Sequence, residues 1–115
     1  MEHRYSERVS VGLPVQVYYQ TQPPLDARVL NVGREGMYIH TDNHPLPRGC
    51  LLRLAFRLPG TGEREFRVPA MVIHNHGEGI GVMFQIIPNR LEQALEELLE
   101  RAANPPKILA FGTGD

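Results

Sequence analysis

Hydrophobic and polar residues alternate along the first three quarters of the chain. Between residues 9 and 19 every odd position is apolar, beginning with Val9 and ending with Tyr19. Because residues two apart point to the same face of a β-strand, this period predicts a strand with one buried face. Pro14 cannot donate a hydrogen bond to a neighbouring strand, so the strand lies at an edge there or carries a bulge.

The alternation returns five more times, and turn-forming sequences separate the segments. We expect strands at 25–32, 37–41, 52–58, 66–76 and 80–86. The expected inward residues of the last three are Leu52, Leu54, Phe56 and Leu58, then Phe66, Val68, Ala70 and Val72, then Ile80, Val82, Phe84 and Ile86. Six strands joined by loops and tight turns, without intervening helices, predict an antiparallel β-barrel or a closed sandwich.

The period changes to three and four residues near the C-terminus. Apolar residues at this spacing form the stripe of an amphipathic helix, which includes Leu91, Leu95, Leu98 and Leu99. Asn89 suits the N-cap position, and Glu92 follows at the spacing of a capping box. We predict a helix over 88–104, with its stripe packed against the barrel or against a second subunit.

The composition excludes several classes of protein. The charges nearly cancel, with 12 basic and 13 acidic residues, so no overall field attracts the chain to nucleic acid or to an anionic membrane. Cys50 is the single cysteine, which excludes an internal disulfide and a cysteine-based zinc cluster. No apolar run approaches the ~20 residues of a membrane span. We expect a soluble cytoplasmic protein that neither enters a membrane nor binds nucleic acid.

Candidates for catalysis or metal binding are few. His74 and His76 lie two apart in an expected strand, where both imidazoles could face one metal ion. A third ligand would have to come from His3, His40 or His44. A metal-dependent enzyme stays open as an alternative, but we expect no catalytic residues, no metal and no cofactor. The helix carboxylates Glu92, Glu96 and Glu100 are interpreted as a solvated face.

The N-terminus carries a sharper candidate, because Arg4 and Arg8 immediately precede the first strand. In an extended or irregular segment, both guanidinium groups can turn to one side. Such a pair suits two phosphates, or one phosphate and the O6 and N7 edge of guanine. The alternative is two solvated arginines in a frayed terminus.

The order of three motifs resembles that of the PilZ domain, a bacterial receptor for cyclic di-GMP. The first is Arg4-Tyr5-Ser6-Glu7-Arg8, the second is Asn31-Val32-Gly33-Arg34-Glu35-Gly36, and the third is Gly79-Ile80-Gly81-Val82-Met83-Phe84. PilZ domains are six-stranded barrels with a C-terminal helix. The resemblance implies that Arg4 and Arg8 grip the phosphates and guanine of the dinucleotide, and that the Asn31 loop holds a guanine edge.

One position of the second motif departs from the family pattern. The family usually has Ser where this chain has Gly33, so a hydroxyl donor is missing from the expected pocket. A lost hydrogen bond costs about 0.5–3 kcal/mol, depending on the charge of its partner. Glycine lets a ligand approach more closely, which recovers part of this loss. We expect Gly36 to be structural, supplying a positive φ or a tight turn, and Asn31 to be the polar contact.

These features predict a cyclic di-GMP receptor that acts as an adaptor. We divide the chain into a flexible ligand-binding segment (1–8), a barrel (9–87), a helix (88–104) and a tail (105–115). Binding is expected to draw the first segment across the barrel mouth and to signal to an unknown protein partner, in motility, biofilm or pilus control. We expect a monomer or a weak homodimer. The alternative is a PilZ-like interaction module that ignores the nucleotide and uses Leu98 and Leu99, or the tail, to bind a partner.

Overall fold

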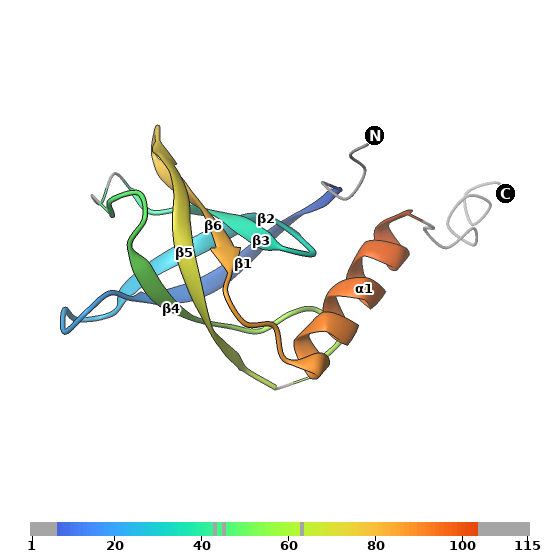
Figure 1. The fold of residues 1–115 in the computed structure, drawn as a ribbon. Coiled ribbons are helices and arrows are strands. Elements are labelled where there is room, and N and C mark those ends of the chain that lie inside the picture. The colour runs from blue at the N-terminus through green and yellow to red at the C-terminus, as the bar shows by residue number, and fades with distance from the viewer. Residues whose placement is uncertain (1–6, 43, 45, 63, 104–115) are drawn as a thin grey trace, which may run out of the picture.

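The computed structural model describes residues 7–42, 44, 46–62 and 64–103, which form six strands and one helix (Figure 1). The elements are β1 (Arg8–Tyr18), β2 (Leu25–Gly33), β3 (Gly36–His40), β4 (Leu51–Phe56), β5 (Phe66–His76), β6 (Gly79–Phe84) and α1 (Asn89–Ala103). Each expected strand is present, with ends that differ by two residues or fewer from those predicted.

The strands form a closed barrel in the order β1-β2-β3-β6-β5-β4, and every pairing is antiparallel. Four of the six pairings join strands that are consecutive in the chain. The other two, β1 with β4 and β3 with β6, close the barrel. The predicted six-stranded antiparallel barrel with a C-terminal helix is confirmed.

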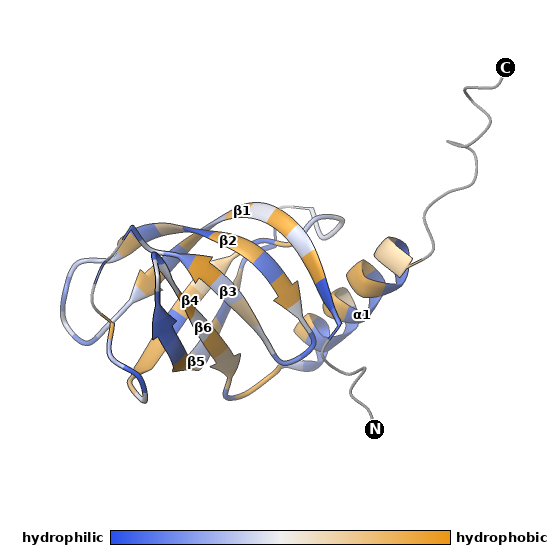
Figure 2. Ribbon diagram, turned by 90° about the horizontal axis from the view of Figure 1, so that it is seen from above, coloured by the Kyte–Doolittle hydropathy of each residue, from blue (hydrophilic) through white to orange (hydrophobic). Residues whose placement is uncertain are grey.

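Hydrophobic and hydrophilic residues alternate along the strands (Figure 2). The apolar side chains of this pattern form one buried core. Phe56 lies at the centre of an aromatic cluster, with ring centroids 6.0 Å from Phe66 and 6.3 Å from Phe84. The other strand residues of this core that are almost fully buried are Val15, Val17, Val29, Val32, Met37, Ile39, Leu52, Leu54, Val68, Ala70, Val72, Ile80 and Val82.

Two expectations for individual strand residues have different outcomes. Pro14 pairs with Arg28 of β2, but β4 joins β1 only from Val15 onwards, and the β1–β2 register shifts between Ser10 and Leu13. On the side of β1 that faces β4, Pro14 has no strand partner. The proline therefore lies at a local edge, as predicted. Ile86 was expected to point inward, and this is wrong: β6 ends at Phe84, and Ile86 is 66% exposed in the connection to α1.

Helix α1 packs its apolar stripe against one end of the barrel (Figure 1). Leu91, Leu95, Leu98 and Leu99 are all buried within this one chain. The alternative that Leu98 and Leu99 bind a partner is therefore wrong, because both side chains are already buried within this chain. The expected cap is also displaced by one residue, since the Pro88 carbonyl accepts the first helical hydrogen bond from the Glu92 N–H at 2.9 Å.

Within the part of the chain that the structure describes, no helix is long and apolar enough to cross a membrane. The helix of 15 residues is instead amphipathic, with buried leucines and exposed charged side chains.

Candidate functional site

The site begins where the first strand of the barrel begins. Arg8 is the first residue of β1 and pairs with Gly33, the last residue of β2. Asn31 lies two residues earlier in β2, opposite Ser10. The Arg8 guanidinium donates a hydrogen bond from Nη1 to Asn31 Oδ1 at 2.9 Å. The antiparallel pairing thus brings together two predicted ligand residues that are 23 positions apart in sequence.

Arg4, the other predicted arginine, lies outside the described residues, as does most of the expected 1–8 segment. The exposed Arg8 guanidinium carries five N–H donors, and the bond to Asn31 uses one of them. An anion such as a phosphate can therefore approach Arg8 from solvent and bind through the remaining donors.

The loop between β2 and β3 is held to two other elements. The Glu35 carbonyl accepts a hydrogen bond of 2.8 Å from the Phe84 N–H at the end of β6. Arg34 Nη1 lies 3.3 Å from Glu96 Oε2 on α1, and each of these two side chains is about half exposed. The loop is therefore fixed from β6 and α1 while its neighbour Asn31 contacts β1.

Gly33 is a position of close backbone contact, which the sequence did not reveal. A Cβ atom at Gly33 would lie 2.8 Å from the Glu7 carbonyl oxygen and 3.5 Å from Arg8 Cγ. The first distance is shorter than real Cβ contacts allow, so a side chain here requires Glu7 to move. Glycine at position 33 therefore does more than remove a hydroxyl group. It permits the Glu7 backbone to lie directly on the end of β2.

Gly36 is structural, but for a different reason from the one expected. Its φ is not among the positive values, which belong to Gly49, Gly60, Gly62 and Gly77 among the described glycines. Gly36 instead pairs with Met83 of β6, and a Cβ there would overlap the Val82 carbonyl. Its buried position lets β3 and β6 come together and anchors the C-terminal end of the loop.

The remaining candidates do not form a reactive site in the described part of the chain. The His74 and His76 rings lie 6.3 Å apart, but no group of three or more potential metal ligands occurs among the described residues. Burial raises the pKa of the Cys50 thiol, which favours the neutral form over a nucleophilic thiolate.

One contact of the site was missed from sequence. Arg34 is part of the second motif, but Glu96 was interpreted only as a member of a solvated helix face. Their ion pair depends on how α1 packs on the barrel, which the period of the helix does not specify. The only signal in the sequence was Arg34 itself, a charged residue between the two glycines of the loop.

The PilZ domain family matches residues 2–101, so the chain belongs to this family. The match includes both arginines of the first motif and the whole Asn31–Gly36 loop. PilZ domains are binding and adaptor modules rather than enzymes. No match was found among curated proteins.

Solved structures with the same fold include three with informative names. The Bacillus subtilis inhibitor of motility MotI/DgrA has a TM-score of 0.75 and 22% identity, over 90% of this chain and 52% of that protein. The PilZ domain of Escherichia coli YcgR with c-di-GMP has a TM-score of 0.68 and 18% identity, over 96% and 98% of the two chains. The PilZ domain of CeSA from a cellulose-synthesizing bacterium has a TM-score of 0.65 and 16% identity, over 86% and 100%. The chain thus spans about half the length of MotI/DgrA.

Proposed function

We propose that this protein is a receptor for cyclic di-GMP that signals through protein contact. The observation that carries the proposal is the 2.9 Å hydrogen bond between Arg8 and Asn31. These residues belong to two separate family motifs, and the fold places their polar groups side by side. The similar fold of the YcgR PilZ domain, whose structure contains c-di-GMP, supports the same ligand here.

The ligand would use Arg8 as an anchor for a phosphate or a guanine edge. A phosphate competes well with the neutral amide of Asn31, because it carries a negative charge and can accept two parallel hydrogen bonds from the guanidinium. Once Arg8 turns to the ligand, the Asn31 carboxamide becomes available for a guanine edge. Arg4 would supply the second guanidinium.

Binding would also change the conformation of the N-terminal segment. Glu7 packs against Gly33 and Arg8 is bonded to Asn31, so moving Arg8 to a ligand disturbs both contacts. Such a change at the start of β1 is the proposed signal to a partner. The fold shared with an inhibitor of motility makes motility control the process that we propose for this output.

Isothermal titration calorimetry of cyclic di-GMP into wild type, Arg8→Ala and Arg28→Ala tests the proposal. Arg28 is a matched control, since it is an exposed strand arginine that pairs with Pro14 and His40 and belongs to neither of the two family motifs. Loss of charge-assisted bonds should cost Arg8→Ala about 1.5–3 kcal/mol, roughly ten- to 150-fold in affinity. Arg28→Ala should bind like wild type. Equal affinity of all three proteins would contradict the assigned site.

The second candidate function is a PilZ interaction module that does not bind the nucleotide. The observation in its favour is that the Glu7 carbonyl lies against Gly33, where the family usually has a serine. An Arg4→Ala variant distinguishes the two functions. A receptor loses affinity for the dinucleotide, whereas a module without a ligand is unaffected by the substitution.

A further inference from the structure

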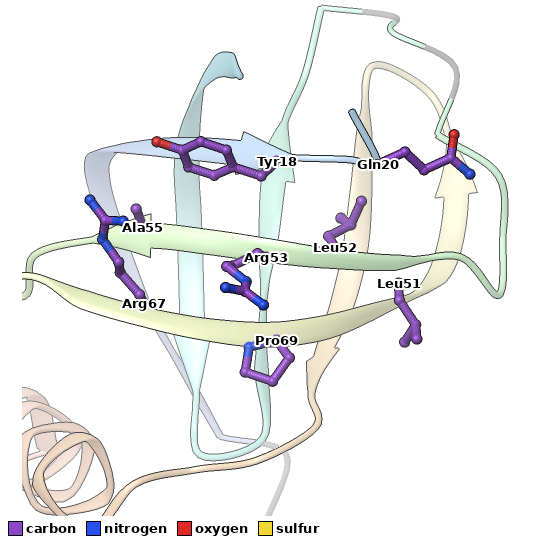
Figure 3. Close-up of a pocket in the computed structure, with 8 residues that line it drawn as sticks. All are labelled: Tyr18, Gln20, Leu51, Leu52, Arg53, Ala55, Arg67 and Pro69. Carbon is purple, nitrogen blue, oxygen red and sulfur yellow. The ribbon is translucent and has the colours of Figure 1, made fainter. Parts of the chain in front are cut away.

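A hollow of about 530 Å³ lies on the outer wall formed by β1, β4 and β5 (Figure 3). Tyr18 of β1 pairs with Arg53 of β4, and Ala55 of β4 pairs with Arg67 of β5. The small side chains of Ala55 and Pro69 make the floor, and the longer side chains surround it. Figure 3 shows Arg67 reaching from β5 toward Ala55, and Arg53 extending from β4 toward β5.

The two charged residues that line this hollow, Arg53 and Arg67, are both basic, although the whole chain carries a formal charge of −1. Arg53 is exposed, and no ion pair involves it within the described residues. Arg67 is 64% exposed at its side chain and contacts Glu65 through Nε at 3.2 Å, which leaves the terminal nitrogens to other partners. Two guanidinium groups on adjacent strands therefore face solvent beside an aromatic ring.

Leu51 adds an apolar group at the edge of the same hollow. It is 59% exposed, and it lies two residues before Arg53 on the same strand face. Arginine and tyrosine are enriched in protein-binding hot spots, and here they share one concave surface with an exposed leucine.

We propose that this hollow binds an acidic segment of a partner protein. Carboxylates would pair with Arg53 and Arg67, because the planar guanidinium matches a carboxylate through two parallel hydrogen bonds. An apolar residue of the segment would pack on Leu51. Single-stranded nucleic acid fits less well, since Tyr18 is the one aromatic residue among the described residues that line the hollow, and stacking of successive bases needs several.

The hollow and the candidate nucleotide site lie at opposite ends of β1. Arg8 is the first residue of this strand and Tyr18 the last, ten positions apart, which corresponds to roughly 33 Å of extended chain. A partner in the hollow would therefore leave the dinucleotide site open. If the protein is a cyclic di-GMP receptor, as proposed above, this hollow is where it would contact its signalling partner. The binding of an acidic segment does not depend on that function.

The test is a random-peptide phage display selection on immobilised wild-type protein, followed by synthesis of the enriched peptide. Fluorescence anisotropy then measures the affinity of this peptide for wild type, Arg53→Glu and Arg67→Glu. The control is Arg28→Glu, which makes the same charge change on the wall formed by β1, β2 and β3. Circular dichroism and cyclic di-GMP titration of each variant report separately on folding and on the nucleotide site.

We expect enrichment of peptides in which Glu or Asp neighbours an apolar residue. Arg53→Glu and Arg67→Glu should each weaken binding at least about tenfold, while Arg28→Glu changes it less than about twofold. Failure to enrich acidic peptides, or equal binding to Arg53→Glu, would overturn the proposal. So would binding of a labelled single-stranded oligonucleotide that Arg53→Glu abolishes. If wild type binds the acidic peptide but not cyclic di-GMP, the proposed receptor function is wrong, while the proposed binding of an acidic segment in the hollow is supported.

Discussion

Arg8 and Asn31 form a hydrogen bond of 2.9 Å across the first two strands, from the guanidinium Nη1 to the carboxamide Oδ1. The contact joins the first residue of β1 to the polar residue that precedes the β2–β3 loop. It therefore links the N-terminal end of the barrel with the loop that the PilZ pattern assigns to ligand binding. A ligand that turns the Arg8 guanidinium away from Asn31 replaces this bond with bonds of its own.

Replacing Asn31 with Ala should weaken cyclic di-GMP binding more than it weakens the fold. The bond to Arg8 is solvent-exposed, so its loss should lower the free energy of unfolding by at most about 1 kcal/mol. Loss of a guanine contact should reduce affinity by roughly three- to tenfold. Urea denaturation and calorimetry measure the two effects. Asn31→Asp keeps an acceptor for Arg8 and serves as the control; unchanged affinity in Asn31→Ala would remove Asn31 from the site.

Comparing Gly33→Ser with Gly33→Ala separates the effect of a hydroxyl group from the effect of a Cβ atom at this position. Both side chains require the Glu7 carbonyl to move, so both should lower the unfolding free energy by about 1 kcal/mol or more. The serine adds a donor for the ligand, so it should bind cyclic di-GMP as well as wild type or more tightly, whereas the alanine gains no donor. Thermal denaturation and calorimetry report on each. A large loss of affinity in Gly33→Ser would show that the pocket is misassigned.

Gly36→Ala should be among the most destabilising glycine substitutions in the barrel. The new Cβ overlaps the Val82 carbonyl in the β3–β6 pairing, and overpacking of this kind costs about 1–3 kcal/mol. Gly12→Ala is the matched control, because the nearest atoms to its Cβ lie 4.0 Å away in the flexible Arg28 side chain. Urea denaturation of both variants should show a clear difference; equal stability would mean that the two strands separate at Gly36 without cost.

The Arg34–Glu96 ion pair should contribute little to stability and should depend on salt. Both side chains are about half exposed, so a double-mutant cycle with alanine should give a coupling of about 0.2–1 kcal/mol at low ionic strength. In about 1 M salt the coupling should approach zero, because the Debye length falls to roughly 3 Å. A coupling that persists in salt would indicate a packing contact between the loop and α1 instead of an ion pair.

The strands were predictable because the alternation of apolar residues repeats six times with clear turns between. The prediction failed at Ile86, where the apolar period continues beyond the end of β6 although the chain has already turned toward Pro88. Strand order was not accessible, since the β1–β4 and β3–β6 pairings join segments that no local pattern connects.

The candidate site was predicted in part. The motif pattern identified Arg8 and Asn31, and the structure brings them into contact. The reasons for the two glycines were not predictable, because a sequence does not show that the Glu7 carbonyl lies over Gly33 or that the Val82 carbonyl lies over Gly36. The Glu96 partner of Arg34 was missed for the same reason, since it depends on tertiary packing.

The most direct test of the account is calorimetric titration of cyclic di-GMP into wild type and into the double variant Arg4→Ala/Arg8→Ala. The account predicts micromolar or tighter binding to wild type, which corresponds to about −8 kcal/mol or better, and no saturation in the double variant. The receptor function would be contradicted if wild-type protein, shown to be folded by circular dichroism, gave no saturation up to about 1 mM ligand. That concentration corresponds to a binding free energy of about −4 kcal/mol.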